Sequence, residues 1–159
     1  MKLYKVKKSN IDKRGLYTSK NIKSGTKIIE YIGKLISKKE TETNPKFDNE
    51  KDIYLFNINS KYDLDGDYNW NSARLINHSC NPNCEVEGKG LKLWISAIKD
   101  IKKGEELSYD YGFGYDVDYK QFPCRCGSQN CVGYIVREGS RWRINKKFKK
   151  KNLRINKSL

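Results

Sequence analysis

Two separated stretches hold the side chains of this sequence that are best suited to chemistry. The first, residues 77–80, reads N-H-S-C and contains the only histidine of the chain, His78. The second follows a C-x-C-x₄-C pattern and contains Cys124, Cys126 and Cys131. Three cysteines this close together, joined by a fourth from upstream, are typical of a tetrahedral Cys₄ zinc site. The two stretches therefore predict one active region built from segments that are far apart in the sequence.

The number of cysteines is odd, because the chain has five. In a cytosolic chain, clustered cysteines are more often metal ligands than disulfides. Four ligands would leave Cys84 as a spare, which we interpret as a small buried or surface thiol. Residues 1–8 lack the apolar stretch of a secretory signal peptide, and no run approaches the roughly 18 apolar residues of a membrane span. We therefore expect a soluble protein that is made in a cytosol.

Length and composition indicate one folded domain. The chain has 159 residues, enough to bury a real core. Charged residues make up 33% and aromatic residues 12%, including 11 tyrosines. This composition is polar but globular, and it excludes a disordered chain.

The net charge of +14 is concentrated near the C-terminus. Residues 140–159 carry nine basic side chains and no acid, whereas the other 139 residues carry 24 basic and 19 acidic groups. A basic tail after a folded domain commonly contacts nucleic acid, anionic partners or import factors. Residues 146–151 also resemble an import signal. A solvated tail without a specific partner is the alternative.

The order of short apolar runs predicts a mainly β fold with short helical pieces. Four stretches rich in β-branched and aromatic residues predict strands, with turn residues between them; they are 27–33, 52–58, 91–98 and 106–111. Residues 37–42 predict a short helix in which Ser37 is the N-cap and Glu40 completes a capping box. Residues 43–51 are expected to form a loop.

Several familiar catalytic patterns are absent. The chain contains no G-x-G-x-x-G and no G-x-x-x-x-G-K-[ST], which removes support for Rossmann and P-loop nucleotide binding. His78 has no second histidine with which to form a hydrolase zinc site. Nothing in the sequence arranges it in a triad with Ser and Asp. Taken alone, His78 is better interpreted as a core or surface histidine than as a catalyst.

An ordered series of motifs nevertheless resembles the SET-domain protein lysine methyltransferases with a C-terminal post-SET zinc segment. Residues 74–83 match the R-x-x-N-H-S-C-x-P-N signature of that family, and residues 101–111 include its G-E-E-L-x-Y-D-Y signature. Residues 14–17 resemble the N-terminal cofactor-binding turn, while 28–35 and 54–56 resemble two of the family's strands. The C-x-C-x₄-C run resembles the post-SET segment. The resemblance covers about residues 10–136 of this chain.

The resemblance implies a fold and a domain division. The family fold consists of small curved sheets with few short helices, and includes a pseudoknot in which the chain after the N-H-S-C motif passes through a loop of earlier chain. That threading is an exception to the usual rule. By this resemblance, residues 1–118 form the SET domain, 119–139 the post-SET zinc-binding segment and 140–159 the basic tail.

The resemblance also implies a reaction, the transfer of a methyl group from S-adenosylmethionine to a lysine amine. Tyr111 is similar to the tyrosine at the methyl-transfer centre, and Tyr31 to a second tyrosine of the lysine channel. Tyr109 occupies the position at which a tyrosine, rather than a phenylalanine, usually accompanies monomethylation. We therefore expect mainly monomethylation, with dimethylation second.

The remaining site residues are implied by the same resemblance. The expected contacts to S-adenosylmethionine are Arg14, Gly15, Leu16, Tyr54, Arg74, Leu75, Asn77 and His78. The expected zinc ligands are Cys80, Cys124, Cys126 and Cys131. The cofactor turn departs from the family's G-x-G form, because Lys13 occupies the first glycine position.

Substrate and location are predicted only broadly. The family's usual targets are histone tails, so a histone or another basic protein is the expected substrate, with nucleic acid or a nucleosome contacting the basic tail. We expect the protein in the cytoplasm or the nucleus, which would be a host nucleus if the source is a virus or an intracellular bacterium. Two alternatives are a non-catalytic SET module that binds a lysine peptide and a zinc-stabilised nucleic-acid-binding protein.

Overall fold

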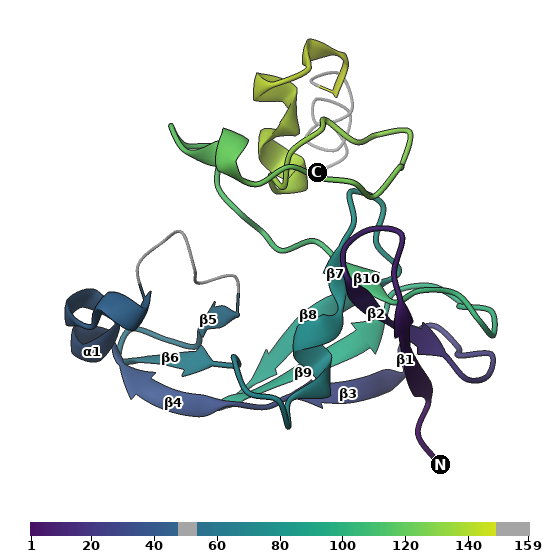
Figure 1. Ribbon diagram of the computed structural model, residues 1–159, viewed down its shortest axis with the longest axis horizontal. Helices are drawn as coiled ribbons and strands as arrows, with labels where there is room; N and C mark the ends of the chain where they lie inside the picture. Colours follow the sequence, from purple (N-terminus) through teal and green to yellow (C-terminus); the bar gives the residue numbers. More distant parts are fainter. Residues whose placement is uncertain (48–53, 149–159) are drawn as a thin grey trace, which may run out of the picture.

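The computed structural model describes residues 1–47 and 54–148 (Figure 1). Within those residues, short strands dominate, as the sequence predicts. The strands are β1 Tyr4–Lys8, β2 Arg14–Thr18, β3 Lys27–Tyr31, β4 Lys34–Ser37, β5 Leu55–Asn57, β6 Tyr62–Asp65, β7 Asn77–His78, β8 Cys84–Lys89, β9 Lys92–Ala97 and β10 Ser108–Tyr109. The helices are α1 Lys38–Thr43 and the 3-10 helices η1 Pro45–Phe47, η2 Ser72–Leu75, η3 Tyr119–Gln121, η4 Glu138–Arg143 and η5 Lys146–Phe148.

The described strands form four small sheets. Three of these sheets are antiparallel, with the orders β1-β2, β3-β9-β8 and β4-β6-β5. The fourth pairs β7 with β10 in parallel, so that Asn77 lies opposite Ser108 and His78 opposite Tyr109. This pairing brings the N-H-S-C motif beside the strand that leads to Tyr111. The two motif segments of the predicted pseudoknot are therefore neighbours in space (Figure 1).

The predicted strands are present but shorter than expected. The stretch 27–33 gives β3, 91–98 gives β9, and 106–111 keeps only the two residues of β10. From 52–58 the structure gives β5, while residues 52 and 53 lie outside the described part. Strands β1, β2, β4, β6, β7 and β8 were not predicted, because their apolar residues are few and lysines interrupt the pattern.

The predicted helix start is confirmed at α1. The Glu40 backbone N–H donates to the Ser37 Oγ at 3.2 Å, which satisfies one of the free donors of the first turn. The expected loop 43–51 is wrong at residues 45–47, which form η1, and its residues 48–51 lie outside the described part. No helix in the described part of the chain is long and apolar enough to cross a membrane.

One apolar core joins the sheets to the motif segments. Its buried members are Leu16, Ile22, Ile28, Tyr31, Leu64, Ala73, Ile76, Cys84, Leu93, Ile95, Ala97, Ile101, Leu107 and Tyr109. Tyr31 and Tyr109 belong both to this core and to the predicted catalytic set. The core therefore fixes those two rings in place.

The chain after β10 crosses back over the N-H-S-C segment. In Figure 1 this green and yellow segment lies above the sheets and carries η3 and η4. Its folded length extends beyond the expected post-SET boundary at residue 139, because Ser140 and Arg141 are buried. The prediction of a solvated basic tail from residue 140 is therefore wrong for its first residues. Residues 149–159 of that predicted tail, including three of the import-signal residues, lie outside the described part.

Candidate functional site

Asn77 holds the N-terminal turn against the motif segment. Its side-chain amide, on β7, lies 2.9 Å from the Glu106 Oε1 and 3.1 Å from the Ser9 Oγ. It also lies 3.2 Å from the backbone oxygens of Asp12 and Arg14. Two amide hydrogens shared among four acceptors anchor the whole turn. Asn77 therefore positions the turn that the sequence assigns to cofactor binding.

Gly15 is required by this close packing. A Cβ added there would lie 2.2 Å from the Glu106 Oε1 and 3.3 Å from the Asn77 Nδ2. Glu106 is itself held by the Ser9 hydroxyl at 2.7 Å and the Tyr17 hydroxyl at 2.8 Å. Glu106 was not among the predicted site residues, although it lies within the 101–111 motif. Its position in that motif is the signal that could have identified it.

Lys13 adopts the conformation that a glycine would favour. Its φ is +40°, and it is the only non-glycine residue of the described chain with a positive φ. Its carbonyl accepts a hydrogen bond from the Ser9 N–H at 3.1 Å, which closes the turn. A side chain in the left-handed region costs roughly 1–2 kcal/mol. The turn is thus formed with Lys13 in place of the family's glycine.

His78 is a hydrogen-bonding residue whose ring is buried. Its Nδ1 accepts the backbone N–H of Tyr111 at 3.1 Å, so the proton of a neutral ring resides on Nε2. That Nε2 lies 3.6 Å from the Cys80 Sγ. The ring therefore bridges the tyrosine segment and the cysteine group. This arrangement agrees with the prediction that His78 is not an acid–base catalyst.

The three predicted catalytic tyrosines gather with Phe56 in one aromatic cluster. Ring centroids lie 4.6 Å apart for Tyr31 and Phe56, 6.1 Å for Phe56 and Tyr109, and 4.9 Å for Tyr109 and Tyr111. The Tyr111 hydroxyl donates to the Ile76 carbonyl at 2.8 Å, and the Tyr31 hydroxyl donates to the Tyr54 carbonyl at 3.0 Å. Phe56 was predicted only as part of a strand.

Burial governs the protonation of these tyrosines. Desolvation raises the pKa of Tyr31, Tyr109 and Tyr111 well above the ordinary value, and the neighbouring phenols add to this effect. All three hydroxyls therefore stay neutral near pH 7. They can orient a hydrogen-bonding partner without carrying charge.

A cavity of about 230 Å³ lies between the N-terminal turn and the C-terminal segment. Its lining combines apolar, aromatic and polar side chains: Ile11, Asp12, Asn77, His78, Tyr111, Gln121, Phe122, Pro123, Cys124, Arg125 and Ile135. Asn77 and His78 are the predicted cofactor contacts that line this cavity. Tyr111 reaches it as well, which places a predicted catalytic residue at its wall.

The other predicted cofactor residues lie elsewhere. Gly15 and Leu16 are buried behind the turn, and Arg14 is exposed. Tyr54 lines a second cavity, of about 300 Å³, together with Asp65 and Asp67.

Arg74 stacks over the Tyr54 ring at 5.6 Å and donates to the Asn69 Oδ1 at 2.7 Å. Leu75 ends η2 and packs against the core. The structure therefore separates the Tyr54 and Arg74 pair from the cavity that Asn77 and His78 line.

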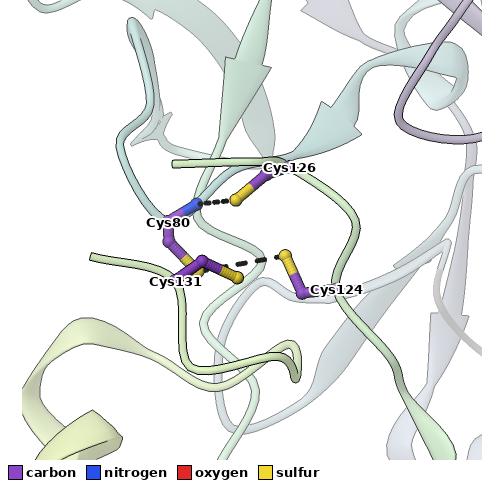
Figure 2. A group of neighbouring side chains, drawn as sticks. All are labelled: Cys80, Cys124, Cys126 and Cys131. Atoms are coloured by element: carbon purple, nitrogen blue, oxygen red, sulfur yellow. Dashed lines mark hydrogen bonds between the residues drawn. The ribbon is translucent and has the colours of Figure 1, made fainter. Parts of the chain in front are cut away.

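Four cysteines converge from two segments, as the sequence predicts (Figure 2). The Sγ atoms of Cys80, Cys124, Cys126 and Cys131 all lie within 4.8 Å of one another, and those of Cys80 and Cys124 are 3.9 Å apart. All four are free thiols rather than disulfides. Zn–S bonds of about 2.3 Å in a tetrahedron place sulfur atoms roughly 3.8 Å apart. The cluster therefore has the donors and the size for one zinc ion.

Backbone N–H groups support the sulfur atoms. The Cys80 N–H donates to the Cys126 Sγ at 3.5 Å and the Gly133 N–H to the Cys131 Sγ at 3.3 Å. Cys84 takes no part, because it is buried in the core, where desolvation raises its pKa to about 12. This agrees with its interpretation as a small buried thiol.

Arg141 connects the cysteine group to the tyrosine segment. Its guanidinium donates to the Cys80 carbonyl at 2.8 Å, to the Val136 carbonyl at 2.9 Å and to the Asp110 carboxylate at 2.7 Å. The residue is only 2% exposed. Asp110 directly precedes Tyr111, so Arg141 holds both parts of the candidate site. Sequence reasoning missed this role because Arg141 lies in a run of basic residues.

The curved antiparallel sheets, the β7–β10 pairing and the cysteine group define a SET domain, and residues 13–112 match the SET domain family model. The chain belongs to this family.

The relatives carry related names. The chain is 40% identical over 130 residues to human histone-lysine N-methyltransferase 2D, covering 78% of this chain and 2% of that protein. It is 41% identical over 135 residues to the H3 lysine-4 specific histone-lysine N-methyltransferase of Schizosaccharomyces pombe, covering 80% and 14%. It is 39% identical over 134 residues to trithorax of Drosophila melanogaster, covering 80% and 4%. The chain therefore spans only a small part of the length of these relatives.

Proposed function

We propose that this chain is an S-adenosylmethionine-dependent protein-lysine N-methyltransferase that acts on a histone or another basic protein. The observation that carries the proposal is the position of Tyr111. It lines the cavity that contains Asn77 and His78, and its ring also joins the cluster of Tyr31 and Tyr109. A residue shared by a polar cavity and an aromatic cluster suits a transfer between a cofactor and a substrate amine. The names of the relatives support the same reaction.

The lining of the cavity has the chemistry to hold S-adenosylmethionine. Ile11, Phe122 and Ile135 offer apolar surface to an adenine ring, and residues 77–78 offer polar groups. The two charged residues of the lining, Asp12 and Arg125, have opposite signs. Opposite charges suit the zwitterionic amino-acid end of the cofactor. When bound, the cofactor supplies an electrophilic methyl group on a sulfonium.

The tyrosines provide the surroundings that the substrate amine needs. A free lysine has a pKa near 10.4, and only the neutral amine can attack a methyl group. Desolvation and a nearby positive charge both lower that pKa. The buried rings of Tyr31, Tyr109 and Tyr111 exclude water, and their neutral hydroxyls can orient the amine. Because Tyr109 is a tyrosine rather than a phenylalanine, we propose that monomethylation dominates and dimethylation is second.

The cysteine group would hold a zinc ion with a structural role. The fit of four thiols to a tetrahedron supports this assignment. A metal there would tie Cys80, beside the cofactor cavity, to the C-terminal segment. The domain limits 1–118 and 119–139 remain part of this proposal, as do a cytoplasmic or nuclear location and a nucleic-acid contact of the basic tail.

The test is methyl transfer from radiolabelled S-adenosylmethionine to core histones, nucleosomes and a cell lysate. Tyr111→Phe should lose most of the labelling, because it removes the hydroxyl and keeps the ring. Tyr62→Phe is the matched control, since Tyr62 is 40% exposed on β6. Equal labelling by wild type and Tyr111→Phe would remove the catalytic assignment. Lysine-peptide binding with no labelling by the wild type would instead favour a non-catalytic SET module.

A further inference from the structure

The first 27 residues carry a large share of the positive charge of the described chain. They contain nine basic residues and one acid, Asp12. Residues 28–139 contain 15 basic and 18 acidic residues, so they are slightly negative. A lysine-rich composition alone would spread its charge along the chain. The separation of charge therefore calls for a local explanation.

Strand β1, Tyr4–Lys8, presents much of this charge to solvent. It is the edge of the two-stranded sheet β1-β2, and Lys5, Lys7 and Lys8 are all exposed. Lys8 lies directly opposite Arg14 in the register, and both side chains are exposed. Like charges directly opposite each other destabilise a strand pair. The pair therefore costs stability unless an anion lies against it.

Acidic partners for this surface are nearly absent within residues 1–47 and 54–148. Of the nine basic residues, only Lys23 lies within ion-pair distance of a carboxylate, at 2.7 Å from Asp100. The sole acid of the segment, Asp12, lines the cofactor cavity. The charge of β1 is thus available to a partner.

A second element extends the same basic surface. The Thr18 hydroxyl donates to the Lys102 carbonyl at 2.7 Å, and the Lys103 N–H donates to the Asn21 Oδ1 at 2.8 Å. These bonds place the exposed residues Lys102 and Lys103 beside the end of β2. The neighbouring carboxylate of Glu105 accepts the Lys102 N–H at 3.0 Å. We define the basic ribbon as strand β1, Arg14, Lys20, Lys102 and Lys103.

We propose that the basic ribbon binds the phosphate backbone of duplex DNA. Lysines on an extended edge strand can meet a row of phosphates without reading bases. Val6, at 43% exposed, is the one large apolar residue of the ribbon beyond a third exposed, so bases have no exposed ring to stack on and a membrane has little to accept. The choice of DNA rests in part on the proposed histone substrate, which lies beside DNA in a nucleosome. The binding itself does not depend on catalysis.

The test compares two triple variants of the full chain on a labelled duplex of about 30 base pairs, by fluorescence anisotropy from about 50 to about 200 mM salt. Lys5→Gln, Lys7→Gln and Lys8→Gln are combined in the first. The control combines Lys39→Gln, Lys61→Gln and Lys89→Gln, which are exposed on other elements and lower the net charge equally. Three lost phosphate contacts should flatten the slope of log K against log salt by about 2.7. We expect at least a tenfold weaker affinity at the lowest salt for the first variant, and less than a threefold change for the control.

Equal losses in the two variants would overturn the proposal, as would no loss in either. Anionic vesicles bound more tightly than DNA would also overturn it. The double variant Lys102→Gln and Lys103→Gln, on a separate loop, should weaken DNA binding independently of any effect on β1 folding. Methylation of a free histone peptide should be unchanged in all variants. If no variant or wild type methylates, the proposed enzyme fails while the DNA result still stands.

Discussion

Replacing Arg141 should reveal how strongly the C-terminal segment is coupled to the candidate site. In Arg141→Met, three hydrogen bonds are lost from a buried guanidinium. Removing one partner of a buried ion pair costs about 3–5 kcal/mol. Asp110 keeps the N–H groups of Gly112 and Glu138 at 2.9 and 3.1 Å, and its side chain is 24% exposed. We therefore expect the lower end of the range, about 3 kcal/mol.

The assay is urea unfolding of the zinc-loaded chain, with Arg143→Met as the matched control. Arg143 lies in the same 3-10 helix but is exposed, so its loss should cost under about 1 kcal/mol. A loss of about 3 kcal/mol corresponds to a fall in Tm of roughly 6–12 °C for a chain of this size. Arg141→Lys should be intermediate, because an ammonium cannot span all three acceptors. Less than about 1 kcal/mol for Arg141→Met would refute this reasoning.

A double-mutant cycle locates the coupling. Arg141→Met and Asp110→Asn should be non-additive by at least about 1 kcal/mol, since the two side chains contact each other at 2.7 Å. Arg141→Met should also weaken zinc binding by about 10- to 100-fold, because the Cys80 carbonyl would keep only Asn130 as its donor. An additive cycle with unchanged zinc affinity would show that Arg141 acts only through local packing.

Further predictions concern the turn, the metal and the tyrosines. Tyr109→Phe should raise the methylation state, and an unchanged product distribution by mass spectrometry would contradict the role of its hydroxyl. Removal of zinc by a chelator should abolish activity and expose amides of residues 112–148 to hydrogen exchange, whereas full turnover with metal shown absent would rule out that dependence. Lys13→Gly should be more stable than Lys13→Ala by about 1 kcal/mol in urea, since only glycine adopts the φ of +40° freely; equal stabilities would argue against strain there. Stability should fall as pH rises above about 10, because burial raises the pKa of Tyr111 and two neighbouring tyrosines, and the unfolded phenols then ionise first. Tyr111→Phe should make that fall shallower, and an unchanged slope would show that its phenol is not the group involved.

Contiguous motifs made much of the candidate site predictable. The cysteine pattern and the N-H-S-C stretch identified all four members of the cysteine group, and the structure brings them within 4.8 Å of one another. The tyrosine motif likewise identified Tyr109 and Tyr111, which pack at 4.9 Å. In both cases the spacing along the chain is short enough that local backbone geometry determines what the side chains can reach.

Contacts between distant segments were less predictable. Tyr54 and Arg74 were expected at the cofactor, yet they pair with each other beside the second cavity. Strand β1 has one exposed valine among lysines, so its apolar pattern is too weak to predict a strand. It forms because its backbone pairs with β2, whose Leu16 is fully buried in the core. Tertiary pairing decides the outcome at such a strand.

Charge is the property that was most misleading when summed along the sequence. The count assigned Arg141 to a solvated tail, but its guanidinium is buried and neutralised by Asp110. The same count treated residues 1–139 as nearly balanced, although their first 27 residues have eight more basic than acidic groups. A buried charge with a partner contributes to folding, while an exposed charge without one is free to bind an anion. The structure therefore directs the search for a nucleic-acid contact toward the basic ribbon at the N-terminus as well as the C-terminal tail.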